Sequence, residues 1–471
     1  MAEKVVIAGA GTTGFQVARH LIADNKNVVL IERDPETAKY AVNHLDCMVI
    51  NDSGNRLPAL REAGIEAADF FISVTDSDEL NIVSCGLVAS EFGVPCKIAR
   101  VRNPDYANSN LSGHSLMDVD YFVNPEIEAA QAIVKSVEQG ATSDVMTFEN
   151  TDLQMRNFMV DSRTLFAKQS IASIKQALDA DFLVAGISRG EDFFVPRGDT
   201  VVESGDELYL VAAEHTLEEV FVIAGRPRVD LNRVLLIGGG RVGSFVAGSL
   251  TQRGFSSNGS RSRRPRRLLD YLRRHNKRLK IVDANYDNCK RLAEQFPEAV
   301  VINSDVSEEG FFEEEALAGS DLIITTTDNP ELNILVAIYA KTLGIKRSIA
   351  LVNKFNYLTV ASRLGADVII SPKYSVVNTI LKFIRRGKVK SVHSIFGGLA
   401  EVIESTLDGS RGFVGRAVRD VRMPDNSLIV AVTRNGSHIV PRSNYTLRDR
   451  DKLTMVAKTE SISRVEEMFN T

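Results

Sequence analysis

The sequence predicts an α/β protein with two tandem Rossmann-like doubly wound domains, each followed by a small α+β domain. Two observations favour this fold class. Apolar runs break into a glycine-rich turn and then a helical pattern at KVVIAGAGTTGFQVARHL (4–21) and again at RVLLIGGGRVGSFVAGSL (233–250). The stretches after the two turns also match one another, and a chain of 471 residues is too long for one ordinary core.

The composition is that of a folded globular protein, with 44% hydrophobic and 25% charged residues. The net charge of -5 gives no overall attraction to nucleic acid or anionic lipid. No apolar run approaches the roughly 18 residues needed to span a bilayer, and VVIAGAG is too short for a leader segment, so we expect a cytoplasmic protein. The cysteines form no CxxC pair, which predicts neither disulfides nor a metal site; they are Cys47, Cys85, Cys96 and Cys289.

The first glycine turn follows the β-branched run 5–8 and precedes a helical pattern. Gly9 is expected to allow the tight turn, Gly11 to let a pyrophosphate approach, and Gly14 to let helix and strand pack closely. The free amides at the helix start then face the anion, each favourable contact contributing about 0.3 to 1 kcal/mol. The candidate phosphate-binding residues are Gly9, Ala10, Gly11, Thr12, Thr13 and Gly14. A lone GxGxxG pattern also occurs in plain glycine-rich turns, so the residues beyond it decide the interpretation.

The apolar run 28–31 ends in Glu32, at the distance where a dinucleotide fold places an acid on the adenosine ribose. A carboxylate there accepts bonds from two hydroxyls and repels a 2'-phosphate. The sequence therefore predicts binding of NAD, ADP or ATP in preference to NADP.

The second copy repeats this pattern, with a strand expected at 279–282 that closes on Asp283. Its candidate phosphate-binding residues are Gly238, Gly239, Gly240, Arg241, Val242 and Gly243. The segment ADFFISVTDSDELNIVSC (68–85) corresponds to SDLIITTTDNPELNILVA (320–337), and VNPEIEAAQAIVKSVEQG corresponds to ISPKYSVVNTILKFIRRG. We predict domains at 1–140, 141–228, 229–387 and 388–471, of which the first and third are the nucleotide-binding lobes.

The two small domains show short β-like runs, such as FLVAGISR and LIVAVTRN, without a visible catalytic set. The seven histidines are dispersed and none recurs in both halves. The GxxxxGK[ST] pattern is absent, so P-loop hydrolysis has no support. The sequence predicts sites that bind rather than react, with no catalytic residues.

Five motifs carry a resemblance to a known family: GAGTTG, IERD, ADFFISVTDSDELN, IARVRNPDY and VPRGDTVVESGDELYLVA. Together they resemble the peripheral subunit of Trk-type bacterial potassium uptake systems, which belongs to the wider family of RCK or KTN domains. The resemblance spans nearly the whole chain. It implies a cytosolic homotetramer, peripheral on the inner face of the plasma membrane, that gates a membrane potassium transporter through bound NAD(H), ATP or ADP.

The resemblance also implies further site residues. Thr75 and Asp76 would line the first crevice, and Arg100 would contact a phosphate through its planar fork. The alternatives are an ordinary helix N-cap for Thr75 and Asp76 and a surface ion pair for Arg100. In the second half Asp283, Thr327 and Asp328 occupy the matching places, whereas the position of Arg100 is taken by Leu351, so we expect the two sites to prefer different nucleotides.

An arginine-rich insertion at 253–280 distinguishes the second half from the first. Leucines at helical spacing among its arginines suggest a short basic amphipathic helix that contacts anionic lipid or an acidic face of the transporter. The alternative is a solvated surface insertion. Deletion of 257–274 should weaken association with liposomes or transporter if the contact exists.

Two other functions stay open from the sequence. One is an NAD-dependent oxidoreductase with an atypical catalytic set, which turnover against hydroxy acids and amino acids would reveal. The other is a nucleotide sensor for a different transporter, which copurification from membranes would identify.

Overall fold

The computed structural model describes residues 3–107, 116–138, 140–141, 146–147, 153–162, 164–178, 180–190, 192–225, 230–251, 278–308, 310–314, 319–354, 356–385, 393–395, 400–407, 409 and 412–470. The arginine-rich insertion lies outside these residues except for its last three. The chain forms two compact units, one of Met1–Ala141 with Leu231–Ile384 and one of Thr142–Asp230 with Arg385–Thr471. No helix among the described residues is long and apolar enough to cross a membrane.

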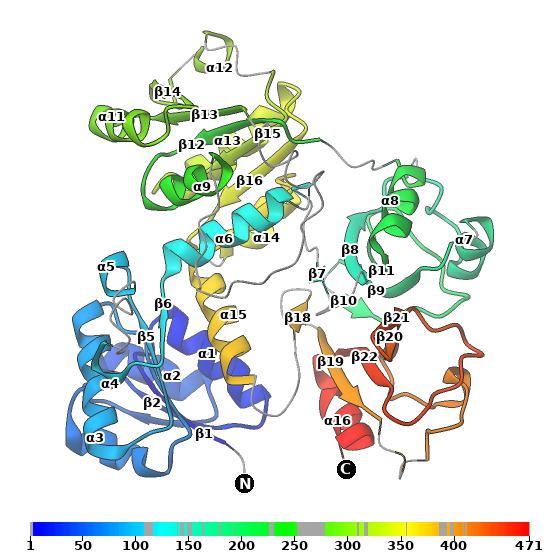
Figure 1. Cartoon of the computed structure of the whole chain (residues 1–471), viewed down its shortest axis with the longest axis horizontal. Helices are drawn as coiled ribbons and strands as arrows, with labels where there is room; N and C mark the ends of the chain where they lie inside the picture. Colours follow the sequence, from blue (N-terminus) through cyan, green and yellow to red (C-terminus); the bar gives the residue numbers. More distant parts are fainter. Residues whose placement is uncertain are drawn as a thin grey trace. The chain divides into compact units, whose positions relative to one another are not determined.

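The first lobe, drawn in blue to cyan in Figure 1, contains a parallel sheet. Its six strands follow the order β3-β2-β1-β4-β5-β6. The strand order reverses between β1 and β4, the switch point where open α/β sheets bind ligands. Val5 and Ile7 face one buried cluster, and Val6 and Ala8 face the other, so both faces of the sheet are covered. The strands are β1 (Lys4–Ala8), β2 (Asn27–Ile31), β3 (Met48–Ile50), β4 (Phe70–Ser73), β5 (Cys96–Arg100) and β6 (Tyr121–Val123), and the main helices are α1 (Thr12–Ala23), α2 (Pro35–His44), α3 (Leu57–Glu62), α4 (Asp78–Phe92) and α6 (Pro125–Glu138).

The second lobe repeats this topology, with a parallel sheet in the order β14-β13-β12-β15-β16-β17. The predicted pair of doubly wound domains is thereby confirmed. The strands are β12 (Arg233–Ile237), β13 (Arg278–Asp283), β14 (Val300–Asn303), β15 (Leu322–Thr325), β16 (Arg347–Leu351) and β17 (Val368–Ile370). The helices are α9 (Arg241–Thr251), α11 (Tyr286–Gln295), α12 (Phe311–Glu314), α13 (Pro330–Thr342), α14 (Asn356–Arg363) and α15 (Pro372–Arg385).

The second unit contains two antiparallel sheets with the same design, in the orders β10-β9-β11-β8-β7 and β18-β19-β22-β20-β21. One buried cluster contains residues of both sheets, including Met155, Val211, Val402 and Val456. The first module comprises β7 (Met146–Thr147), β8 (Leu153–Met159), α7 (Ile171–Leu178), β9 (Leu183–Arg189), β10 (Asp192–Phe194), β11 (Glu207–Ala213) and α8 (Glu214–Ile223); the second comprises β18 (His393–Ile395), β19 (Ala400–Thr406), β20 (Ser427–Arg434), β21 (Ser437–Ile439), β22 (Lys452–Lys458) and α16 (Ile462–Asn470).

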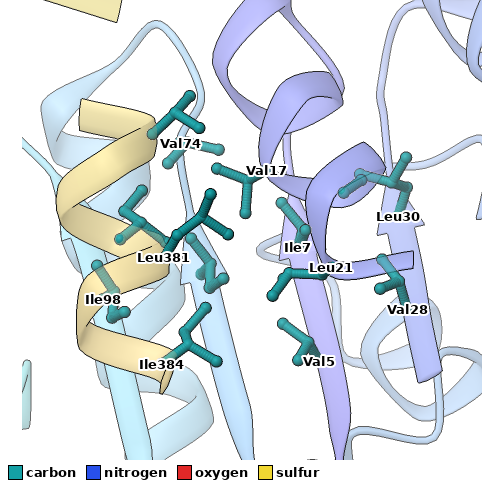
Figure 2. Packing of buried hydrophobic residues seen from close by; sticks show 14 of the residues in the cluster. Val5, Ile7, Val17, Leu21, Val28, Leu30, Val74, Ile98, Leu381 and Ile384 are labelled. Atoms are coloured by element: carbon teal, nitrogen blue, oxygen red, sulfur yellow. The ribbon is translucent and has the colours of Figure 1, made fainter. Parts of the chain in front are cut away.

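The last helices of the two lobes are exchanged. Helix α15 follows the last strand of the second lobe, yet its buried residue Ile380 belongs to the core cluster of the first lobe. Figure 2 shows Leu381 and Ile384 of α15 in this cluster beside the first lobe's own residues. Helix α6 of the first lobe packs against α9 and β17 of the second lobe. The two exchanged helices are also linked directly, because Thr379 Oγ1 donates to Glu128 Oε2 at 2.7 Å.

We expect Ile380→Ala to destabilise the first lobe although Ile380 is encoded in the second half. Ile380 is fully buried, and truncating such a side chain leaves a cavity that costs about 2–5 kcal/mol. Denaturant unfolding followed by a probe in the first lobe measures the loss. The control is Lys382→Ala on the exposed side of the same helix, which should cost much less. Equal unfolding curves for wild type and Ile380→Ala would contradict the exchange.

Each small module contains a buried aspartate held by an arginine. In the second module Arg434 donates from Nε to Asp451 Oδ1 at 2.8 Å and from Nη2 to Asp451 Oδ2 at 2.7 Å, and the amide of Arg448 donates to Asp451 Oδ2 at 2.8 Å. Arg189 and Asp206 form the same two-bond pair in the first module. Burial alone would raise the pKa of Asp451, but the hydrogen bonds from Arg434 and from the Arg448 amide lower it below its ordinary value.

The lowered pKa of Asp451 predicts a pH-dependent stability. An aspartate whose pKa is lower in the folded chain than its unfolded value of about 3.9 stabilises the fold above that pH, and the contribution is lost as the pH falls through the folded pKa. We expect Asp451→Asn to lower the free energy of unfolding by about 1.5–3 kcal/mol at pH 7 and by less below pH about 4. Thermal unfolding at both pH values measures this difference, with Asp449→Asn, whose side chain is half exposed, as the control. A loss that is the same at both pH values would contradict the role of the carboxylate charge.

Candidate functional site

The first glycine turn connects β1 to α1 at the switch point of the first sheet. Gly9 has a φ of +99°, which favours glycine, and its amide donates to Ile31 O at 2.8 Å. A Cβ on Gly14 would lie 1.9 Å from Gly9 O, so only glycine fits there. A Cβ on Gly11 would meet no atom within 4 Å, and the backbone at Gly11 is ordinary extended backbone. The open face of Gly11 is therefore the part of the turn that has room for a ligand.

The remaining residues of the two turns differ in what they expose. Thr12 and Arg241, the first residues of α1 and α9, are exposed. Thr13 and Val242 are buried, each 7% exposed, so their side chains offer little surface to a ligand.

One carboxylate at the end of β2 and one at the end of β13 accept hydrogen bonds from the glycine turns. Glu32 Oε2 accepts from the amide of Ala10 at 2.6 Å, and Glu32 Oε1 accepts from the amide of Asp34 at 2.8 Å. Asp283 repeats both contacts in the second lobe, accepting from the amides of Gly239 at 2.6 Å and Asn285 at 2.8 Å. These bonds hold each carboxylate beside its turn, where its remaining lone pairs can accept from hydroxyl groups.

The fourth strand of the first sheet ends in a polar network centred on Asn81 of α4. Asn81 is fully buried, and its Oδ1 accepts from Thr75 N at 2.9 Å and from Thr75 Oγ1 at 2.7 Å. Its Nδ2 donates to Thr75 O at 3.1 Å and to Arg100 O at 2.8 Å, which ties the ends of β4 and β5 together. The N-cap of α4 is Ser77, which accepts from Leu80 N at 3.1 Å, so the alternative interpretation of Thr75 and Asp76 as the cap is wrong.

The second lobe repeats this network with Asn333, which binds Thr327 through its amide, hydroxyl and carbonyl groups and donates to Leu351 O at 2.9 Å. Asn329 is the N-cap of α13, and Asp328 is exposed. Asn81 and Asn333 lie in the matched segments 68–85 and 320–337 but were not among the predicted site residues. Their signal was the spacing of six residues after a threonine at the end of a strand, in both halves.

Arg100 is the last residue of β5, and its side chain is 11% exposed. Its Nη1 donates to Thr75 O at 3.0 Å and lies 3.5 Å from Asp76 Oδ1, which also lies 3.4 Å from Arg102 Nη2. Burial lowers the pKa of Arg100, and the nearby charge of Arg102 lowers it further. The buried Nε of Arg100 has no hydrogen-bond partner among the described residues. Arg100 is thus paired with Asp76 but is not a solvated surface ion pair, and it keeps a donor for an anion.

The second crevice carries a different set of charges. Gly238 has a φ of +95°, and a Cβ on Gly243 would lie 1.9 Å from Gly238 O, as in the first turn. The position of Arg100 is occupied by Leu351, which is 5% exposed. Arg291 of α11 donates from Nη2 to Gly239 O at 3.2 Å, a cation beside this turn that sequence reasoning missed. No group of three or more His, Cys, Asp or Glu suited to a metal ion is found among the described residues.

A glycine turn at the switch point of a doubly wound sheet, with an acid at the end of the second strand, defines a nucleotide-binding class of domain, and this chain contains it twice. The TrkA-N domain model matches residues 5–125 and 262–372, and the TrkA-C domain model matches 155–225 and 402–470. The chain belongs to the family built from these two domains in tandem.

Curated relatives match the chain over nearly its full length. It is 29% identical over 470 residues to the "Trk system potassium uptake protein TrkA" of Azorhizobium caulinodans, covering 99% of this chain and 98% of the relative. It is also 29% identical to the "Trk system potassium uptake protein TrkA homolog" of Archaeoglobus fulgidus, covering 99% of this chain and 100% of the relative.

Among solved structures, the GsuK RCK domain is similar with a TM-score of 0.53 and 18% identity, covering 99% of this chain and 95% of that one. The GsuK channel bound to NAD has the same TM-score and identity and is covered over 79% of its length. This similarity shows the fold alone, and it agrees with the predicted RCK architecture.

Proposed function

We propose that the chain is the cytoplasmic regulatory subunit of a Trk-type membrane potassium transporter, and that it responds to an adenine nucleotide bound in its first crevice. The role as a transporter subunit is supported by the full-length relatives, which are named as Trk system potassium uptake proteins. The NAD bound to the GsuK channel supports a nucleotide as the ligand. The homotetramer, and its place on the inner face of the plasma membrane, belong to the same proposal.

One observation carries the nucleotide assignment. The buried guanidinium of Arg100, at the end of β5, keeps an unpaired Nε, and Gly11 leaves open space at the switch point of the same sheet. An isolated buried donor on a cation is costly, and a phosphate oxygen is a ligand that would satisfy it. Glu32 would then accept from the ribose hydroxyls. NAD(H), ADP and ATP fit this set because each joins an adenosine ribose to phosphates.

The regulatory role requires two arrangements of the lobes that bind the phosphates of the nucleotide with different affinities. A ligand biases such an equilibrium only by its differential affinity for the two states, and about 1–3 kcal/mol of coupling gives a 5- to 150-fold effect. We propose no catalytic step. Reconstituted transporter whose potassium flux ignores both this protein and added nucleotide would contradict the regulatory role.

Glu32→Gln is expected to change which nucleotide is bound. The amide retains an acceptor for the Ala10 amide but loses the charge that repels a 2'-phosphate. We expect affinity for NAD to fall about tenfold, the equivalent of 1.4 kcal/mol, while the preference for NAD over NADP shrinks. Calorimetry with both dinucleotides measures this, and Asp283→Asn is the matched change in the second lobe. An unchanged preference in Glu32→Gln would remove Glu32 from the site.

A further inference from the structure

The exchanged helices α6 and α15 begin with opposite charges at equivalent positions. Each starts with a proline directly beyond the last strand of its lobe, and the next residue is Glu126 in α6 and Lys373 in α15. Because the lobes share one topology, these two residues lie at corresponding places. The exchange brings each of them to the first turn of the other lobe's opening helix.

Lys373 reaches the first glycine turn from the second lobe. Its Nζ donates to Thr12 Oγ1 at 3.3 Å, and Thr12 is the first residue of α1. The first bond of this helix runs from Phe15 N to Gly11 O, so the amides of residues 12–14 precede it. Such amides attract an anion, and an exposed ammonium group at the same place adds a full positive charge.

The equivalent contact in the other direction has the reverse charges. Arg241 corresponds to Thr12, and its Nη1 lies 4.0 Å from Glu126 Oε1. The buried Glu126 Oε2 has no hydrogen-bond partner among the described residues. The negative charge of Glu126 partly offsets the fall in the pKa of Arg100. The second glycine turn therefore receives a carboxylate from the exchanged helix where the first receives an ammonium group.

We propose that Lys373 is a phosphate ligand of the first crevice, supplied by the second lobe, and that a nucleotide bound there ties α15 to the first lobe. The ligand class is an adenosine nucleotide with at least two phosphates. The second turn receives Glu126 in place of Lys373 from its exchanged helix, and its own cations are Arg241 and Arg291. This inference rests on the proposed nucleotide binding of the first crevice.

Calorimetry on the full chain with ADP and with adenosine tests the proposal. Lys373→Gln should weaken ADP binding about tenfold and make it less dependent on salt, while adenosine binding stays unchanged. Lys373→Arg should restore most of the affinity for ADP. The matched control is Lys382→Gln on the same helix. The positive charge of Lys382 counteracts the rise in the pKa of Glu128 and adds to the fall in the pKa of Lys135. The Lys382→Gln chain should bind ADP like wild type.

Three results would overturn the proposal. Unchanged ADP affinity in Lys373→Gln would remove the contact, and an equal loss for ADP and adenosine would show a structural role only. An equal loss in Lys382→Gln would mean that any lost charge on α15 has the same effect. If the wild-type chain binds ADP and the Lys373 variants bind it equally well, the proposed function stands and only the role of Lys373 is rejected. If the wild-type chain binds no adenosine nucleotide, the proposed function and the role of Lys373 are both rejected.

Discussion

Replacement of Gly11 by valine is expected to weaken nucleotide binding strongly in the first crevice while the chain stays folded. The new side chain would meet no protein atom within 4 Å of its Cβ, and the extended backbone at Gly11 accepts any L residue. It would instead occupy the space through which phosphates approach the α1 amides. We expect a loss of about 100-fold in ADP affinity, or about 2.7 kcal/mol.

Calorimetry measures the binding, and thermal unfolding serves as the check on the fold. The melting temperature should change little, because replacing the N-cap glycine by an apolar residue costs less than about 1 kcal/mol. Gly240→Val is the matched control in the second turn, which is equally open. If Gly11→Val binds ADP like wild type and Gly240→Val does not, the nucleotide site belongs to the second lobe.

Gly14→Ala is expected to have the opposite effect, a large loss of stability. Its Cβ would lie 1.9 Å from Gly9 O and 3.2 Å from Val74 Cγ2, so α1 would have to move away from the sheet. Overpacking of this kind costs about 3 kcal/mol, which corresponds to a melting temperature lower by on the order of 10 °C.

Differential scanning calorimetry tests the effect of Gly14→Ala. Gly243→Ala should reproduce it in the second lobe, since its Cβ would also lie 1.9 Å from a glycine carbonyl, that of Gly238. Gly11→Ala, three residues earlier in the same turn, should leave the unfolding temperature nearly unchanged. A stable Gly14→Ala chain would mean that the strand and helix are not packed as closely as the structure places them.

Much of the fold could be predicted because its signals are local. The glycine at 9 is required by a positive φ and the glycine at 14 by close contact, and both appear in the spacing of the sequence. The duplication could be read from matched letters such as Thr75 and Thr327. Strand order followed from the general rules for βαβ units rather than from any single residue.

The candidate site could be predicted only in part. Glu32 and Asp283 lie beside their glycine turns because a parallel strand must end there. The burial of Arg100 could not be read from IARV, since nothing in four letters shows which side chains cover the end of β5. Arg291 also escaped prediction, because its contact with Gly239 O joins a helix surface to a distant turn.

The sequence by itself determined two nucleotide-type lobes, their glycine turns and the acids that close them, because periodicity and glycine spacing act within a few residues. Only the tertiary structure decided that α15 covers the first lobe and that Lys373 meets Thr12. The buried residues of α6 and α15 recur at the same helical spacing, so the local pattern does not say which lobe each helix covers. The choice depends on the shape and charge of surfaces far apart in the chain, which no local pattern contains.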